Sequence, residues 1–139
     1  MQKSKERLDH ALHNEAVCEY LTLKQEFADW IITTAFYASL QFVTYKIFPY
    51  EYKDSKGHKH VFQNVDELLD YKQSIFGTSV SKHRLLADLV GEKCPDIADE
   101  YDHLLGMSKN ARYNNYQHPK EAANQARSIM LKIKKYCSK

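Results

Sequence analysis

The sequence predicts an all-α fold, a single-domain bundle of about five to six helices. Apolar residues recur every three or four positions through most of the chain, which is the spacing of one helix face. The chain has 139 residues, of which 43% are hydrophobic, so it suits one domain with a buried core. It contains only 4 Gly and 3 Pro, too few for the many turns that short strands require. We therefore expect one helical domain over residues 1–139.

Two long helices are predicted in the first third of the chain. The first is expected over residues 3–23 and the second over residues 27–48, where Pro49 ends it. The second helix is apolar on nearly every face, which is typical of the buried centre of a bundle. The apolar side of the first helix is expected to comprise Leu8, Leu12, Ala16 and Tyr20, widened by Ala11, Val17 and Leu21.

A polar segment follows the second helix. Residues 50–63 carry Gly57 and many charges, so we expect an exposed, mobile loop. Two strand-like stretches lie within it, residues 50–52 and 60–62, but they are too short to build a sheet alone. A short helix is then expected over residues 65–75, with Asn64 as its N-cap.

The rest of the chain reads as three further helices. One begins at Ser79 or Ser81 and runs to about residue 90, where Gly91 is expected to end it. Pro95 opens the next helix, whose first turn is acidic. The last helix starts at Pro119, and its apolar side is expected to be Ala122, Ala126, Ile129, Ile133 and Tyr136 or Cys137.

Charge is distributed unevenly along the chain, although the net charge is only +2. Residues 109–139 hold eight Lys or Arg against the single Glu121, whereas residues 64–102 are acidic. A cationic C-terminal segment is suited to attract phosphate groups. The alternative is an ordinary solvated helix face.

Several classes of protein are not indicated by the sequence. The three cysteines are widely spaced and match neither a disulfide framework nor a zinc site, so a cytoplasmic location is expected. The N-terminus does not resemble a signal peptide, and the longest uncharged run is too short to span a membrane. Neither His10 with His13 nor His58 with His60 has an obvious third ligand, so no metal or other cofactor is predicted.

The segment around residues 108–123 is the most informative for function. Arg112 ends one predicted helix, and His118 immediately precedes Pro119 at the start of the next. At that position the helix dipole disfavours a second positive charge, which favours the neutral imidazole that can accept a proton. A guanidinium stays charged and can hold a phosphate in a fork. The pair is suited to phosphodiester cleavage without a metal.

At these residues the sequence resembles a HEPN domain. The resemblance is carried by the helical framework, the segment 29–40 (DWIITTAFYASL), the pair His83-Arg84, and above all Arg112 followed by five residues and His118. The HEPN family consists of helical bundles, often dimeric, of prokaryotic toxin–antitoxin and defence systems. Many members are metal-independent endoribonucleases with the motif Arg, four to six residues, then His.

The resemblance covers roughly residues 10–137 and implies roles for single residues. His118 would act as general base or acid at the ribose 2′-OH, and Arg112 would stabilise charge in the transition state. The products would carry 2′,3′-cyclic phosphate and 5′-OH ends, and a homodimer would share one cleft. Active members commonly have a small polar residue where this chain has Tyr113. The remaining candidate RNA-binding residues are Tyr113, Asn114, Asn115, Tyr116, Lys120, His83 and Arg84, of which the tyrosines are suited to stack on bases.

Two other interpretations stay open at this stage. The same fold is compatible with binding RNA or nucleotide without cleavage, or with pairing to an antitoxin or a nucleotidyltransferase-type protein. A purely structural role is the third interpretation, with Arg112 neutralising a helix end and His118 capping a helix. Asp29 either pairs with Arg84 or Arg112 or faces solvent near the start of its helix.

Overall fold

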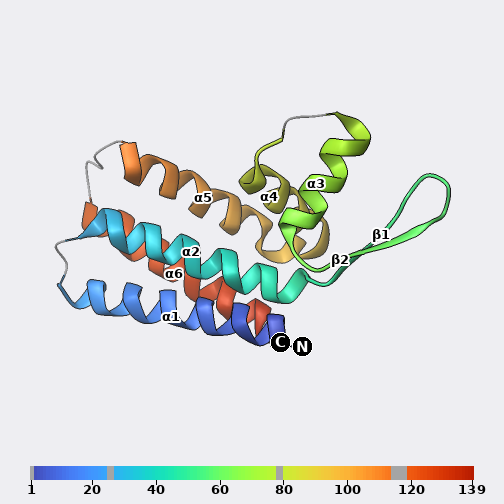
Figure 1. Ribbon diagram of the computed structural model, residues 1–139. Coiled ribbons are helices and arrows are strands. Elements are labelled where there is room, and N and C mark those ends of the chain that lie inside the picture. Colours follow the sequence, from blue (N-terminus) through green and yellow to red (C-terminus); the bar gives the residue numbers. More distant parts are fainter. Residues whose placement is uncertain (1, 25–26, 78–79, 114–118) are drawn as a thin grey trace.

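The computed structural model describes residues 2–24, 27–77, 80–113 and 119–139, with the backbone alone for residues 2–4, 24, 112 and 113. Over these ranges the all-α prediction is confirmed (Figure 1). The helices are α1 (Gln2–Lys24), α2 (Ala28–Ile47), α3 (Val65–Phe76), α4 (Lys82–Lys93), α5 (Ala98–Tyr113) and α6 (Pro119–Cys137). A small hairpin of β1 (Tyr50–Lys53) and β2 (Lys59–Phe62) lies between α2 and α3.

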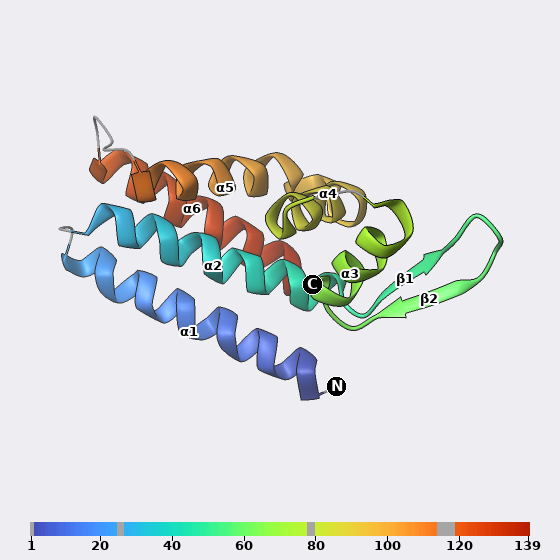
Figure 2. The same cartoon turned by 45° about the horizontal axis from the view of Figure 1, so that its top comes forward.

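Helix α2 is the centre of the bundle, as its sequence predicts. It packs against α1, α6, α5 and α4. Eleven of its 20 residues are buried, and among them Phe36 and Phe42 are almost fully enclosed. A helix that is apolar on most of its surface is stable only when neighbours cover several faces. Figure 2 shows α1 and α5 running in one direction and α2 and α6 in the other.

The predicted inner face of α1 is partly wrong. Ala11 and Cys18 are fully buried and Leu8 packs against the core, but Leu12 is 40% exposed and Tyr20 is 61% exposed. A helix repeats every 3.6 residues, so each step of four residues turns about 40° past a full turn. A stripe built from four-residue steps therefore drifts away from the core over three steps.

The segment 50–63 forms a hairpin, so the prediction of an irregular loop is wrong. The strands are antiparallel, with Tyr50 opposite Phe62 and Lys53 opposite Lys59. Both Tyr50 and Phe62 are buried at the base of the hairpin, and the ring of Phe62 lies 5.3 Å from that of Tyr71 in α3. A two-stranded hairpin is marginal alone and needs packing against another element. Here α3 supplies that packing.

Cap residues fix both ends of α3 and the start of α4. The Asn64 side chain accepts a hydrogen bond of 2.9 Å from the backbone N–H of Glu67, which confirms it as the N-cap of α3. Gly77 ends α3 in the left-handed conformation at φ 63°, as expected. Ser81 caps α4, but Gly91 does not end it.

Helix α4 continues past Gly91 to Lys93, and this part of the sequence prediction is wrong. A glycine inside a helix costs only about 1 kcal/mol. The extra turn places Cys94, which is 1% exposed, against the core. Pro95 then starts a short 3₁₀ turn, Pro95–Ile97, that leads directly into α5.

Candidate functional site at the junction of α5 and α6

The Arg112–His118 motif brackets the junction between the last two helices. The backbone of Arg112 lies in the last turn of α5, and α6 begins at Pro119, directly after His118. The side chains of Arg112 and Tyr113 lie outside the described residues, as do Asn114, Asn115, Tyr116 and His118. The ends of α5 and α6 confirm the predicted helix boundaries on both sides of the motif. The geometry within the motif stays a prediction.

The junction lies at the end of the bundle where α1 also meets α2. The last turns of α1 and α5 and the first turns of α2 and α6 all lie at this end of the bundle (Figures 1 and 2). Lys120 in the first turn of α6 shares a small hollow of about 50 Å³ with residues of α1 and α2. The other residues that line it are Thr22, Ala28, Ile31, Ala123 and Asn124. The candidate site thus borders three helices besides α5.

Most of the positive charge along α6 is neutralised by ion pairs. Arg127 makes a bidentate pair with Glu19 of α1, with two N–O distances of 2.8 Å. Lys134 contacts Glu15 of α1 at 2.9 Å. Lys132 on another side of the helix pairs with Glu100 of α5. These pairs link α6 to its neighbours, so the basic segment predicted from the sequence is not one continuous cationic face.

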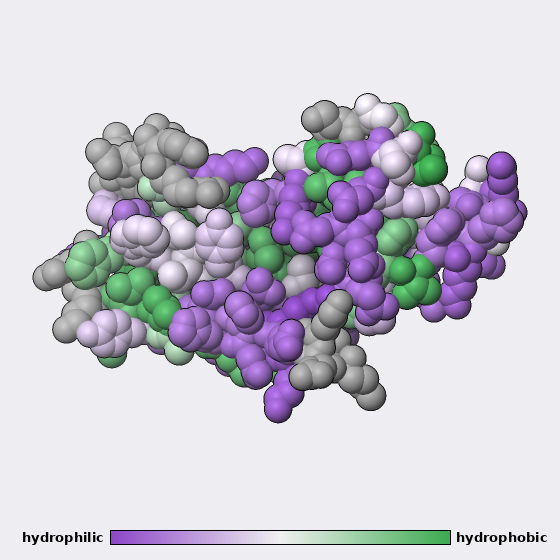
Figure 3. Space-filling view, in the orientation of Figure 1, coloured by the Kyte–Doolittle hydropathy of each residue, from purple (hydrophilic) through white to green (hydrophobic). Residues whose placement is uncertain are grey.

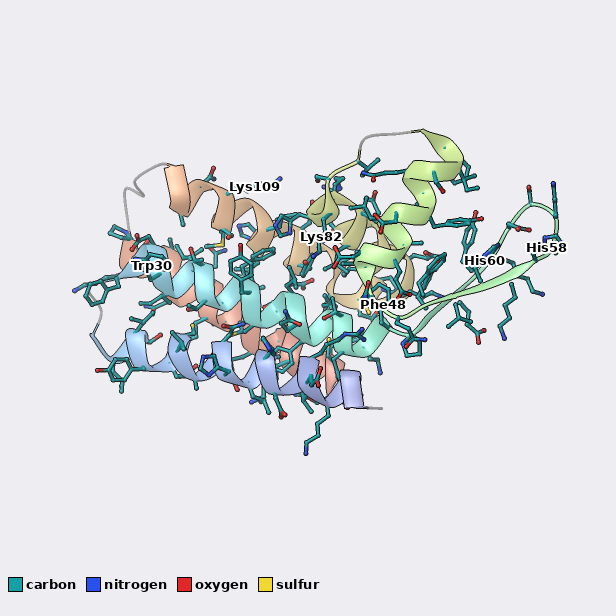
Figure 4. The ribbon with its side chains drawn as sticks, viewed as in Figure 1. Trp30, Phe48, His58, His60, Lys82 and Lys109 are labelled. Carbon is teal, nitrogen blue, oxygen red and sulfur yellow. The ribbon has the colours of Figure 1, made fainter. Side chains whose placement is uncertain are left out.

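Two lysines at the junction end are not paired in this way. Lys109 near the end of α5 and Lys120 at the start of α6 are both exposed, and neither contacts a carboxylate among the described residues. Lys109 lies on the upper helix at this end in Figure 4. The described cations that remain available for phosphate near the motif are therefore Lys109 and Lys120.

His83 and Arg84 lie in the first turn of α4, as predicted, and contact the middle of the bundle. The His83 ring lies edge-on to Phe36, with centroids 5.5 Å apart. The Arg84 guanidinium pairs with Asp88 at 3.2 Å and with Asp102 of α5 at 3.3 Å. Asp102 precedes the motif arginine by ten residues, or about 15 Å of helix rise. That His83 and Arg84 share a cleft with the motif therefore remains a prediction.

The Asp29 side chain is exposed and does not pair with Arg84, whereas the alternative of a pair with Arg112 lies outside the described residues. Its side chain is exposed in the first turn of α2, and Arg84 takes other carboxylates as partners. The hydroxyl of Thr33 donates to the backbone oxygen of Asp29 at 2.8 Å. A carboxylate in the first turn of a helix is favoured by the helix dipole. Asp29 therefore stabilises the start of α2.

Two hydroxyl groups of α5 are buried without a hydrogen-bond partner in the described part of the chain. They belong to Tyr101 and Ser108, and both residues are 0% exposed. The Tyr101 ring lies 5.9 Å from that of Phe36, and burial raises the pKa of its hydroxyl well above the ordinary value. An unsatisfied buried hydroxyl destabilises the folded state.

Exposed aromatic residues at this end were missed by the sequence analysis. Trp30, in the first turn of α2, is 58% exposed, and Phe27 is 43% exposed. Tyr20 and Leu23 at the end of α1 are 61% and 82% exposed. Figure 4 shows Trp30 pointing away from the bundle at the end where Lys109 also lies. The only available signal was the position of the single tryptophan at the start of an otherwise buried helix.

Other candidate chemistry finds little support in the described ranges. There, no three His, Cys, Asp or Glu side chains gather as ligands for a metal ion. His58 and His60 both contact the Asp54 carboxylate, at 3.6 and 3.0 Å, at the turn of the hairpin. The three cysteines are buried and form no disulfide, and burial raises the pKa of each thiol, so they serve as packing residues.

Three comparisons, with family models, with curated proteins and with solved structures, find no match to this chain. The resemblance to HEPN domains therefore rests on the sequence motifs, and the function it implies is a proposal. Among the described helices, none combines the length and the apolar character needed to cross a membrane.

Proposed function

We propose that this chain is a HEPN-like protein that acts on RNA, as a metal-independent endoribonuclease of the toxin or defence type in the cytoplasm. The observation that carries the proposal is the position of the Arg112–x5–His118 motif. Its arginine is in the last turn of α5 and its histidine directly precedes α6. The exposed lysines 109 and 120 lie on either side of the same junction.

The proposed reaction is an internal transfer at one phosphodiester. The imidazole of His118 takes the proton of the ribose 2′-OH, and the 2′-oxygen attacks the adjacent phosphorus. The bond from phosphorus to the 5′-oxygen breaks, and that oxygen takes a proton from water and leaves as the 5′-OH. The Arg112 guanidinium stabilises the negative charge that develops on the phosphate oxygens. The products carry a 2′,3′-cyclic phosphate and a 5′-OH.

The charge distribution supports RNA as the ligand. Since Arg127, Lys132 and Lys134 are occupied by carboxylates, the described cations near the motif that are left for phosphate are Lys109 and Lys120. Exposed aromatic residues at the same end supply surfaces on which bases can stack. We further propose that the chain acts as a homodimer, in which two copies of the motif share one cleft.

The test is to incubate the purified protein with single-stranded and structured RNA in the presence of a metal chelator. Cleavage that leaves cyclic phosphate ends, and that is abolished in His118→Ala, is expected. The matched control is His13→Ala, because His13 is an exposed histidine on α1 and should leave cleavage unchanged. Absence of both cleavage and RNA binding at low salt would refute the proposal.

A second candidate function is RNA or nucleotide binding without cleavage. The observation that favours it is Tyr113, which stands where active HEPN members commonly have a small polar residue. In this case RNA binds to the wild-type chain, weakens with salt and is recovered intact. Co-purification with an antitoxin or a nucleotidyltransferase-type protein would further favour this binding role.

A further inference from the structure

The hairpin projects from the bundle with the outer edge of β1 open. Figure 3 shows it as a strongly hydrophilic arm. Among the described elements, α3 packs against β2, whereas the main neighbour of β1 is β2 itself. An open edge presents unpaired N–H and C=O groups, with which a further strand can pair. The outer edge of β1 is therefore a surface suited to strand pairing.

The hydrogen bonds of the turn determine which backbone groups face outward. The N–H of Asp54 donates to the carbonyl oxygen of His58 at 3.0 Å, so these two residues form a hydrogen-bonded pair of the ladder. Bonded and non-bonded pairs alternate along antiparallel strands. In the observed register, Tyr52 is therefore bonded to β2, and the backbone groups of its neighbours Glu51 and Lys53 point to the open edge.

The side chains on this edge carry opposite charges. Glu51 and Lys53 both lie on the exposed face of β1. Tyr52 between them lies on the other face, where its ring is 5.8 Å from that of Tyr71 in α3. Lys53 is directly opposite Lys59 and forms no ion pair in the described part of the chain. Like charges in opposite positions destabilise a sheet, so a carboxylate on an added strand would offset this repulsion.

A second copy of β1 supplies that carboxylate in one register. Two antiparallel β1 strands related by a two-fold axis at Tyr52 place Glu51 opposite the partner's Lys53, and the symmetry repeats the pair. Both residues direct their backbone groups outward, so each pair exchanges two hydrogen bonds. A shift by two residues sets Glu51 against the partner's Glu51, or Lys53 against the partner's Lys53. A shift by one residue sets outward groups against inward ones.

A hollow beside the edge leaves room for the turn of the second copy. It has a volume of about 300 Å³ and is lined by the end of α2, the start of β1 and the end of α4. In the register above, Tyr50 lies opposite the partner's Asp54, so the partner's turn comes to lie beside this hollow. Lys93 lines the hollow, with its amine 5.2 Å from the centre of the Tyr50 ring. The cation suits a turn that begins with an acidic residue.

We propose that the hairpin is an interface between two copies of this chain, which pair edge to edge through β1 into a four-stranded antiparallel sheet. The self-complementary charges of Glu51 and Lys53 favour a second copy over a strand of another protein. A lysine on an edge strand ordinarily discourages pairing, but here each lysine meets a carboxylate. The larger sheet is also more stable than an isolated hairpin. This contact lies at the opposite end from the α5–α6 junction, so it is independent of RNA and can coexist with the shared cleft proposed above (Figure 1).

The test measures the mass of the protein by sedimentation equilibrium without RNA, from micromolar to millimolar concentration. We expect the mass of the wild-type chain to rise with concentration. Glu51→Lys makes both pairs Lys–Lys and Lys53→Glu makes both Glu–Glu, so each variant alone should associate roughly 10-fold more weakly. An equimolar mixture restores opposite charges in both pairs of a mixed dimer, so association should return. A local fault in either hairpin could not be repaired by mixing.

A backbone variant tests the strand pairing itself. Lys53→Pro removes an outward N–H and leaves the bonds between β1 and β2 in place, so it should abolish association without changing the circular dichroism spectrum. Lys53→Ala should weaken association less, because only the charge is lost. The matched control is Lys135→Glu, which makes the same change of charge as Lys53→Glu at an exposed position of α6 and should leave association unchanged.

Each other outcome would overturn the proposal. A wild-type chain that stays monomeric at the highest concentration would leave the edge to a strand of another protein. An assembly whose mass is the same in every hairpin variant would place the association elsewhere, such as at the shared cleft. Mixed variants that associate no better than each alone would refute the register. None of these results depends on cleavage or RNA binding, so the proposed function is tested separately.

Discussion

The two halves of α6 use their positive charges differently. From Arg127 onward, the helix is joined to its neighbours by the pairs Arg127–Glu19, Lys134–Glu15 and Lys132–Glu100. In the first turn, Lys120 contacts no carboxylate in the described ranges of the chain and borders an open hollow. The same helix therefore fixes α1 and α5 through its second half, and its first turn carries a cation that is left for a ligand.

This difference teaches that a count of basic residues does not define a binding surface. The excess of positive charge in residues 109–139 is clear in the sequence, but a cation that already holds a carboxylate offers little to a phosphate. What matters is which cations lack partners and where they lie. In the described part of residues 109–139, Lys109 and Lys120 lie beside the motif without a carboxylate, whereas Lys135 lies near the other end of α6.

The largest expected effect concerns Arg112. Arg112→Ala should reduce RNA cleavage by about 10²–10³-fold, because one fixed donor to the transition-state charge is lost. Arg112→Lys should recover little of the loss, because an ammonium cannot hold two phosphate oxygens in a fork. The measurement is the single-turnover rate on a labelled RNA in chelator.

The matched control for this experiment is Arg127→Ala on the next helix. Arg127 is committed to Glu19, so its loss should leave the cleavage rate unchanged and lower the stability by at most about 1 kcal/mol. Equal loss of cleavage in both variants would contradict the division of α6 into a structural part and a functional end.

A second prediction concerns stability and contrasts the paired charges of α6 with an unpaired polar group in the core. The Tyr101 hydroxyl is buried without a partner in the described structure, so Tyr101→Phe should stabilise the fold by about 1 kcal/mol and raise the thermal midpoint by a few degrees. Tyr45→Phe, at a partly exposed position, should change little. A loss of stability in Tyr101→Phe would show that this hydroxyl has a partner in solution.

Much of the fold follows from local sequence. The buried character of α2, the Asn64 cap and the Gly77 stop each depend on residues within one helix length, so they are readable in advance. The hairpin is not, because its strands are stable only through Tyr50 and Phe62, which contact residues outside the hairpin, Tyr50 at Glu92 of α4 and Phe62 at Tyr71 of α3. The face of α1 was missed because steps of four residues drift around the helix.

The candidate site shows the same limit. The motif and its position between two helices are visible in the sequence, since Pro119 marks the start of α6. The partner of Arg127 is not visible, because Glu19 is 108 residues away in the chain. Trp30 was also missed, because on a helix that is apolar all round no periodicity tells which residue remains outside.

A third prediction uses the hairpin, at the opposite end from the junction. Burial, with the nearby Glu92 carboxylate, raises the pKa of Tyr50 to about 12 from an ordinary value of 10.0. The folded state therefore keeps the phenol neutral, and its contribution to stability is complete below pH 10 and is lost as the pH rises toward 12. Tyr50→Phe should show a smaller alkaline loss of stability in urea denaturation.

That comparison is best made in the Tyr101→Phe background, because burial also raises the pKa of Tyr101. Cleavage and RNA binding near pH 7 should be the same with and without Tyr50→Phe, since the hairpin is remote from the junction (Figure 1). An unchanged alkaline slope in Tyr50→Phe would mean that the Tyr50 phenol ionises as easily in the folded as in the unfolded chain.

The smallest expected effects come from two lysines of α6, one with a carboxylate partner and one without. Lys120→Ala should weaken RNA binding and lower the salt dependence of the binding constant by about one unit of slope, because one phosphate contact is lost. Its stability should be unchanged. Lys134→Ala should leave RNA binding unchanged. It should cost about 0.5–1 kcal/mol of stability, because Lys134 pairs with Glu15 at 2.9 Å.

The pair is informative because residue type, helix and change of net charge are the same in both variants. Any effect of overall charge on RNA binding would therefore appear equally in each, and only a local contact can separate them. If Lys134→Ala weakens RNA binding as much as Lys120→Ala, the attraction comes from the whole of α6 and the paired lysines still contribute to it. If only Lys120→Ala weakens RNA binding, the phosphate contact lies at the first turn of the helix, directly after His118.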